Sequence, residues 1–326
     1  MAERAHVFSS SVPSIDTAEL KQCVDEYVVH CEHQQQSTRT VEARHMFLRN
    51  LLWFLEHRQC QTCGTHELRQ FFHYLRHGHE EPEGRWGNSQ LTTPMRPVSV
   101  KDYYVGLQSF FKWMVSEDIL EASPMQKVER PRVREEIKQP LNTEQTQALL
   151  RAARSSVNRY RDEAILLMLF DSGIRATELI QLKVKDIDLK NGSFEVQGKG
   201  DKRRCCYLGK NTTRALMVYL RKAKLASDAP LFPSASGVGI GQHLTRSGLL
   251  HLIKRLAKSA GVSANVHQLR RTFATTILSN GSDIVAVRDM LGHSSIHMTL
   301  KYLSVSQSHI EAQHRQFSPA DRLQKK

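Results

Sequence analysis

The stretch DIVAVRDMLGHSSIHMTLKY, residues 283–302, decides how the C-terminal part of the chain is organised. Its first half carries apolar residues at the spacing of one helix face, at Ile284, Val287 and Leu291. Gly292 then ends the helix as the residue best suited to a left-handed terminus. A second helix is predicted over 296–303, with Tyr302 near its end and His293 nine residues before it. The stretch therefore raises the question whether Tyr302 packs on an apolar helix face or acts as a nucleophile.

Length and charge limit the answer. A chain of 326 residues predicts about two domains. Lys and Arg number 46 against 33 acidic residues, a formal charge of +13. Residues 1–140 hold 17 basic and 19 acidic side chains, whereas residues 141–326 hold 29 and 14. An excess of positive charge that is confined to residues 141–326 favours a surface that lies along phosphate groups.

The sequence gives no sign of a membrane or secreted protein. No apolar run approaches the roughly 20 residues that span a bilayer, and the N-terminus lacks an apolar signal core. We therefore expect a cytoplasmic protein without membrane contact. Six cysteines over this length do not resemble a disulfide framework, so reduced thiols are expected.

One cluster has the residue types of a zinc site, His57, Cys60, Cys63 and His66. Structural zinc sites usually join two separated ligand pairs across a turn. We therefore favour cysteines and polar residues at a helix end, and we expect no bound metal.

The first part of the chain reads as helical. Residues 1–15 are polar and predict a flexible tail. Residues 16–125 carry four amphipathic helical segments, near 16–34, 37–58, 65–78 and 98–120. Residues 126–140 mix prolines with charges and show no hydrophobic period, which predicts an interdomain linker.

Residues 141–326 predict a second domain of mixed type. An apolar helix over 161–173 stops near Gly173. The period then changes to alternation around a Gly-rich, charged turn over 192–209, the pattern of a β-hairpin with a basic tip. More helices are expected from 244 onward. The fold class predicted for the whole chain is mainly α, with a small β-hairpin in an α+β second domain and an all-α first domain.

Two local motifs suggest phosphate binding but are weak by themselves. Arg175 and Glu178 stand three residues apart at a helix start, where the usual outcome is an exposed ion pair. His267 and Arg270 would face the same way on another helix. Only the combination of such motifs in one order can carry a function.

That combination is present, and the chain resembles the tyrosine recombinases and phage integrases, the family of the Cre and Xer proteins. The motifs are Arg175 in GIRATEL, Lys199 in GKGDKRR, His267 and Arg270 in HQLR, His293 in LGH, and Tyr302. One departure is Arg271, which stands where the family often has a second histidine.

The resemblance implies a site-specific DNA recombinase that needs no cofactor. It implies a DNA-binding core-binding domain over 16–125 and a catalytic domain over 141–326, closing on a duplex as a C-shaped clamp. A homotetramer on two DNA recombination sites is implied, and an accessory DNA-binding protein is possible. The enzyme would work at the nucleoid, in integration, excision or resolution of a mobile element.

Elementary chemistry assigns the same residues coherent roles. Tyr302 can attack phosphorus and form a 3′-phosphotyrosyl ester. Arg175 and Arg270 can hold the negative nonbridging oxygens with charge-assisted hydrogen bonds. His267 can accept the tyrosine proton, and His293 can donate a hydrogen bond to the phosphate. Lys199 can protonate the departing 5′ oxygen, and Glu178 can brace Arg175.

Two other functions use the same residues. A type IB topoisomerase-like enzyme would take the covalent step on a single duplex and relax supercoils. A catalytically idle DNA-binding protein would keep only the clamp, and the complete set of motifs argues against it. The tail after Tyr302 either docks on a neighbouring protomer or is a polar terminus. The sequence specifies neither the target DNA nor the biological task.

Overall fold

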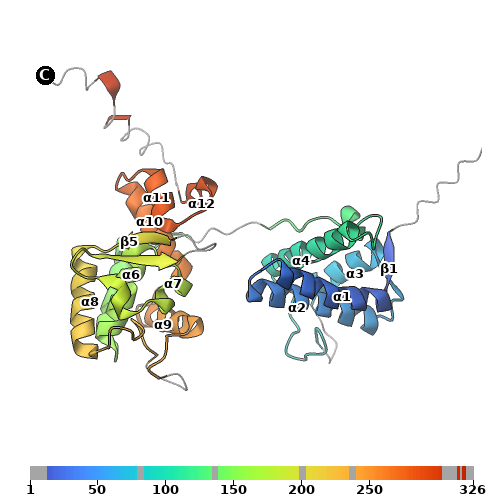
Figure 1. The fold of residues 1–326 in the computed structure, drawn as a ribbon, viewed down its shortest axis with the longest axis horizontal. Helices are drawn as coiled ribbons and strands as arrows, with labels where there is room; N and C mark the ends of the chain where they lie inside the picture. The colour runs from blue at the N-terminus through green and yellow to red at the C-terminus, as the bar shows by residue number, and fades with distance from the viewer. Residues whose placement is uncertain are drawn as a thin grey trace, which may run out of the picture. The chain divides into compact units, whose positions relative to one another are not determined.

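The computed structural model describes residues 13–78, 84–133, 139–197, 203–234, 240–302, 314–315 and 318–320. The chain divides into two compact units, Met1–Glu136 and Ile137–Lys326, which are described separately (Figure 1). Both are mainly helical, and antiparallel strands are small, so the predicted fold class is confirmed. Within the described ranges, no helix is long and apolar enough to cross a membrane.

The described part of the first unit is a bundle of helices around an aromatic core. Its helices are α1 (Thr17–His33), α2 (Thr38–His57), α3 (Thr65–Arg76) and α4 (Pro97–Ser116), with a short 3₁₀ turn at Pro124–Lys127. Helix α4 contacts the other three. The Asp16 side chain accepts hydrogen bonds from the first backbone N–H groups of α1, which is why the helix begins there.

Two short strands add to this bundle. Strand β1 (Ser14–Asp16) pairs antiparallel with β2 (Thr62–Gly64), and Ile15 lies opposite Cys63. Both of these apolar side chains are buried. The first unit is therefore not purely helical, and the expected tail over 1–15 does not extend to residues 14 and 15. Three-residue strands are too short to show an alternating pattern in sequence.

The residues with zinc-like spacing have other partners. Cys63 lies in the core, where burial raises the pKa of its thiol far above the ordinary value. The His57 ring stacks on Trp53 with 4.7 Å between ring centres. Among the residues that the structure describes, no group of His, Cys, Asp or Glu is arranged to hold a metal ion.

Both ends of the segment 126–140 are attached to a unit. Tyr104 donates a hydrogen bond to the carbonyl of Val128, which is buried in the first core. At the other end, the Gln268 side chain donates to the Gln139 carbonyl at 2.9 Å, and Leu141, the residue just after the segment, is buried in the second core.

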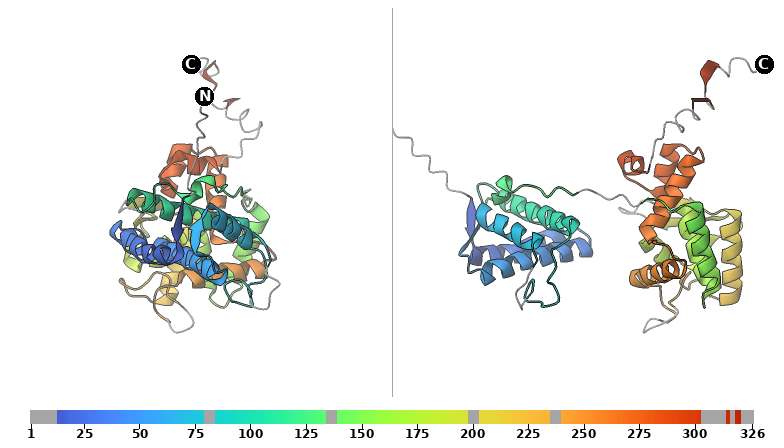
Figure 2. Two further views of the ribbon diagram at one scale, coloured as in Figure 1. Left: turned by 90° about the vertical axis from the view of Figure 1, so that its right-hand side faces the viewer. Right: turned by 180° about the vertical axis from the view of Figure 1, so that it is seen from behind.

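The second unit is built around one buried helix, α6. Its helices are α5 (Thr143–Arg154), α6 (Arg159–Ser172), α7 (Ala176–Gln181), α8 (Lys210–Ala223), α9 (Arg246–Ser259), α10 (Val266–Ser279), α11 (Ile284–Leu291) and α12 (Ile296–Leu300). Helix α6 packs against α5, α8 and α10, and it runs beside α8 in Figure 1 and in the right-hand view of Figure 2. The apolar run predicted to be a helix thus becomes the centre of this core.

A three-stranded antiparallel sheet follows α7. Strand β3 (Ile187–Asp188) pairs with β4 (Ser193–Gln197), which pairs with β5 (Arg203–Tyr207). The predicted hairpin is therefore present, and β3 is an addition of two residues. The tip of the hairpin, 198–202, lies outside the described residues and includes Lys199.

Gly173 fixes the path from α6 to Arg175. Its φ of +58° lies in the left-handed region that glycine adopts without strain. A Cβ at this position would lie 2.3 Å from Cδ1 of Phe273 on α10. The turn therefore requires both the backbone freedom of glycine and its lack of a side chain, because the end of α6 is pressed against α10.

The last described elements form a small separate core. Its members lie on α10 and α11, namely Phe273, Ala274, Leu278, Val287 and Leu291. Tyr302 packs against this cluster. Helix α12 ends at Leu300, three residues earlier than predicted, so Tyr302 lies two residues beyond it.

Gly173→Ala should destabilise the second unit by about 2 to 4 kcal/mol, from left-handed strain plus overpacking. Gly261→Ala is the matched control, because Gly261 has a φ of +66° and a Cβ added there would meet no atom within 4 Å. It should lose only the strain, about 1 kcal/mol. Urea unfolding by circular dichroism measures both. All three tryptophans lie in the first unit, so their fluorescence separates its transition. Equal losses of stability in the two variants would show that the Phe273 side chain moves aside at no cost, contrary to this prediction.

Candidate active site

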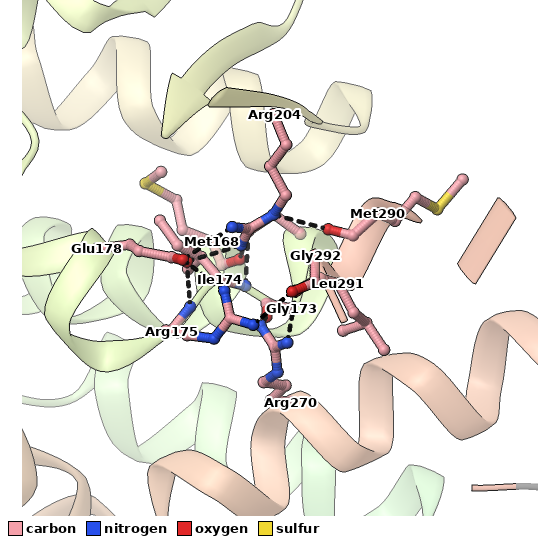
Figure 3. A network of polar contacts seen from close by, with 11 residues as sticks. Met168, Gly173, Ile174, Arg175, Glu178, Arg204, Arg270, Met290, Leu291 and Gly292 are labelled. Carbon is pink, nitrogen blue, oxygen red and sulfur yellow. Dashed lines mark hydrogen bonds and ion pairs between the residues drawn. The ribbon is translucent and has the colours of Figure 1, made fainter. Parts of the chain in front are cut away.

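The C-terminal end of α11 gathers three arginines from three different elements (Figure 3). Each guanidinium donates to one of three consecutive carbonyls, Arg204 to Met290 (3.0 Å), Arg270 to Leu291 (2.6 Å) and Arg175 to Gly292 (2.7 Å). The last carbonyls of a helix have no partner within it, and the helix dipole favours cations there. The end of α11 therefore acts as a template for the arginines.

Gly292 makes this close approach possible. It ends α11 with a φ of +61°. A Cβ there would lie 3.0 Å from Cδ of Arg204 and only slightly farther from its guanidinium nitrogens. The glycine predicted to stop the helix thus also leaves room for an arginine.

Glu178 is the carboxylate that organises two of these arginines. It accepts two hydrogen bonds from the Arg204 guanidinium (2.7 and 2.6 Å), one from the Arg175 guanidinium (2.7 Å) and one from the Arg175 N–H (2.9 Å). Burial alone would raise the pKa of Glu178, but the hydrogen bonds from Arg204 and Arg175 outweigh it and lower the pKa to about 2. Glu178 therefore stays ionised and holds both side chains.

Arg270 lies deepest and has no carboxylate of its own among the described residues. Its side chain donates to the carbonyls of Gly173 and Leu291, both at 2.6 Å, and is 6% exposed. Burial, followed by the charges of Arg175 and Arg204, lowers its pKa to about 10. Three guanidiniums around a single carboxylate leave the site with excess positive charge, which an anion would relieve.

His293 lies beside the arginines and is held by α12. Its Nδ1 is 2.8 Å from the buried hydroxyl of Thr299. Burial, then the charges of Arg270, Arg175 and Arg204, lowers the pKa of His293 to about 4. The imidazole is therefore neutral at physiological pH.

Tyr302 completes the group beside His293. The two rings are stacked with 5.9 Å between centres. The Tyr302 side chain is half-buried and also contributes to the electrostatic environment of Arg270. Arg175, Arg270, His293 and Tyr302, four of the six predicted site residues, are thus brought together by the fold.

Of the other two, only His267 lies in the described part of the chain. His267 is exposed in the first turn of α10, and no hydrogen bond or ion pair of its side chain is recorded among the described residues. It precedes Arg270 by three residues, so it lies on the same side of the helix. Lys199 lies outside the described residues.

Two residues of the site were missed in the sequence. Arg204 closes the pattern G-K-G-x-K-x-R, so the signal was present, but only the lysine was assigned a role. Thr299 carries no comparable signal, since its contact with His293 arises only when α12 folds back. Arg204 also joins β5 to both α7 and α11, so it connects the hairpin of Lys199 to the arginine cluster.

Glu178→Gln should destabilise the second unit by about 3 kcal/mol at pH 7, because it leaves buried guanidiniums without their anion. The carboxylate's contribution is complete above its ordinary pKa of 4.5 and is lost as the pH falls toward 2. The stability difference between wild type and variant should therefore shrink below pH 4.5 in urea unfolding. Glu144→Gln, an exposed carboxylate on α5, should change stability by at most about 0.5 kcal/mol. A stability difference between wild type and Glu178→Gln that does not change with pH would contradict the stabilising role of the Glu178 ion pairs.

The arrangement can bind a tetrahedral anion and attack it. Guanidinium forks match the oxygens of phosphate, and a neutral imidazole can add a directed hydrogen bond. A phenol beside such a site can act as a nucleophile where negative charge is stabilised. This arrangement of guanidiniums, imidazole and phenol fits a reaction in which a phosphate ester is transferred to the tyrosine oxygen.

Comparison with known proteins agrees with this chemistry. Residues 139–309 match the phage integrase family. The chain is 34% identical to tyrosine recombinase XerD of Listeria innocua over 229 residues, 68% of this chain and 77% of that protein. It is 27% identical to tyrosine recombinase XerC of Leptospira interrogans over 318 residues, 94% and 96% of the two chains.

Solved structures share the fold at low identity. The Tn1549 transposon integrase in complex with transposon right end DNA has a TM-score of 0.70 at 17% identity, covering 93% of this chain and 99% of that one. The XerH recombinase bound to its difH substrate has a TM-score of 0.63 at 20% identity, covering 92% and 84%. The relatives are recombinases, which supports the recombinase prediction over the topoisomerase and idle-binder alternatives. The chain therefore belongs to the phage integrase family of tyrosine recombinases.

Proposed function

We propose that this recombinase cuts DNA at specific sites and rejoins the strands to a partner duplex, with Tyr302 as the nucleophile. The observation that carries the proposal is the meeting of Arg175, Arg270, His293 and Tyr302 in one positively charged site. The surplus of positive charge over residues 141–326 supports the same substrate, since DNA offers a phosphate at every nucleotide.

The reaction is an exchange of esters. The Tyr302 oxygen attacks phosphorus, and the 5′ oxygen leaves as a hydroxyl after taking up a proton, giving a 3′-phosphotyrosyl ester. A 5′ hydroxyl from the partner strand then attacks this ester and releases the phenol. Each step replaces one phosphate ester by another, so the bond energy is kept and no nucleotide is consumed.

Arg175 and Arg270 stabilise the charge that develops on phosphorus. Their guanidiniums are already fixed by carbonyls of Gly292, Leu291 and Gly173, so little reorganisation is needed when the phosphate arrives. Each still has N–H groups beyond those bonds, because a guanidinium carries five. The phosphate supplies a negative charge beside Arg270, whose described hydrogen-bond partners are two carbonyls.

His293 acts as a neutral hydrogen-bond donor. Because its pKa is lowered to about 4, His293 is not protonated at neutral pH and does not act there as a cationic general acid. If the Thr299 hydroxyl donates to Nδ1, the ring proton lies on Nε2 and can reach a phosphate oxygen. Thr299 thus sets the tautomer through which His293 serves the reaction.

His267 and Lys199 are assigned the proton transfers. His267 is exposed on the same side of α10 as Arg270, a position open to DNA and to the tyrosine proton. Lys199 belongs to the tip between β4 and β5, and an ammonium on a hairpin is suited to protonate the departing 5′ oxygen.

The remaining assignments concern the whole enzyme. Residues 16–125 form the core-binding domain, residues 141–326 the catalytic domain, and the two close on DNA as a clamp. Two recombination sites brought together imply a tetramer on DNA, with an accessory DNA-binding protein in some reactions. The biological task is integration, excision or resolution of a mobile element at the nucleoid, which the fold shared with a transposon integrase supports.

Tyr302→Phe should abolish the covalent protein–DNA adduct and leave DNA affinity within about twofold of wild type, because a single hydroxyl is removed from a site dominated by cations. The measurement uses DNA nicked near the scissile phosphate, which traps the adduct for denaturing electrophoresis. Selection of bound sites from random duplexes supplies the target. An adduct that persists in Tyr302→Phe identifies a different nucleophile.

Arg175→Ala should slow single-turnover cleavage by about 100- to 1,000-fold, the usual loss for one preorganised donor to a developing oxyanion. Arg221→Ala removes the same charge from an exposed position on α8 and should cleave at nearly the wild-type rate. Cleavage by Arg175→Ala as fast as by the control would remove Arg175 from the phosphate site.

A further inference from the structure

Arg271 is the second arginine of α10, and it points to a different target from Arg270. Its Nη2 donates a hydrogen bond to the Lys301 carbonyl at 3.2 Å, and its Cζ lies 5.6 Å from the centre of the Tyr302 ring. Consecutive residues on an α-helix are turned by about 100°. One helix thus sends Arg270 to the end of α11 and Arg271 to the segment that carries the tyrosine.

The charge of Arg271 is not neutralised by a close carboxylate within the described ranges. No ion pair of this side chain is recorded there, whereas Arg175 and Arg204 share Glu178. Its buried Nε also lacks a hydrogen-bond partner among the described residues. The nearest recorded partners of the guanidinium are therefore the Lys301 carbonyl and the face of the Tyr302 ring.

The tyrosine segment needs an anchor of this kind. Helix α12 has five residues, and Tyr302 lies two residues past its end. The Tyr302 N–H donates to the Thr299 carbonyl at 2.9 Å, which continues only one turn. Helices this short have little stability of their own, so contacts with α10 and α11 determine where the ring lies.

We propose that Arg271 is a positioning residue for Tyr302, an inference that rests on Tyr302 being the nucleophile. Its hydrogen bond to Lys301 ties the backbone beside the tyrosine to the helix of Arg270. Its guanidinium also keeps a positive charge against the ring, where negative charge grows as the phenol gives up its proton. A histidine is shorter and, when neutral, has a single N–H, so it offers one of these contacts and not both.

Arg271→Ala should lower the single-turnover cleavage rate constant by about 100-fold, the effect of a nucleophile misplaced by about 1 Å. DNA affinity should remain within about threefold of wild type, since one of many cationic contacts is lost. Cleavage at the wild-type rate would overturn the proposal. If Tyr302→Phe abolishes the adduct in the same assay, the proposed nucleophile survives and only the role of Arg271 fails.

Conservative variants separate positioning from a loss of folding. Arg271→Lys keeps the charge and should recover at least about tenfold of the rate lost in Arg271→Ala. Arg221→Ala on α8 is the matched control for charge and should cleave like wild type. A lysine variant as slow as alanine, with an unchanged thermal midpoint, would also count against a role for the positive charge.

An external nucleophile shows whether Arg271 acts through Tyr302. In Tyr302→Phe, hydrogen peroxide attacks phosphorus and displaces the 5′ oxygen in place of the phenol. Adding Arg271→Ala should change this peroxide cutting by less than about twofold, the limit for independent sites. Adding Arg175→Ala should slow it strongly. Slower peroxide cutting in the Arg271 double variant would mean that Arg271 serves the phosphate itself, contrary to the proposal.

Discussion

The site depends on the unpaired carbonyls at the end of α11. Three guanidiniums, two of them largely buried, cannot be gathered in one place without groups that accept their hydrogen bonds and offset their mutual repulsion. Met290, Leu291 and Gly292 supply three acceptors in a row, and Glu178 supplies the negative charge. A helix terminus is therefore used as an anchoring point for cations, and the left-handed Gly292 gives them access.

With three guanidiniums and one carboxylate, the site carries a net positive charge. The lowered pKa values of Arg270 and His293 share causes, namely burial and the neighbouring guanidiniums. The excess positive charge of the guanidiniums favours binding of an anion such as phosphate. The same charge disfavours protonation of His293 and so keeps its imidazole neutral. Fixed donors that await an anion are the arrangement that lowers a barrier without reorganisation.

Tyr302, the proposed nucleophile, is supported differently from the arginines. The three arginines lie at the start of α7, on β5 and on α10, elements that contribute residues to the main core, whereas Tyr302 follows a five-residue helix and packs on a small separate cluster. Its ring contacts His293, which follows Gly292, and Arg271, which follows Arg270. Among the described residues, the contacts of Tyr302 with His293, Arg271 and the cluster of α10 and α11 link its position to that of the arginines.

The sequence by itself predicted most of the helices, though not α8, together with the hairpin and the order of the motifs, and it pointed to four residues that the fold brings together. Periodicity and glycine stops are local, and they were sufficient for α6 and α11. The sequence did not reveal β1 with β2, because three-residue strands have no measurable period and their pairing joins residues far apart in the chain, Ile15 with Cys63. Only the tertiary structure decided the partners of Arg204, Thr299 and Arg271, since a hydrogen bond across the fold leaves no trace in spacing. Whether a charged side chain is solvated or clamped depends on which backbone groups reach it, and that is a property of the folded chain.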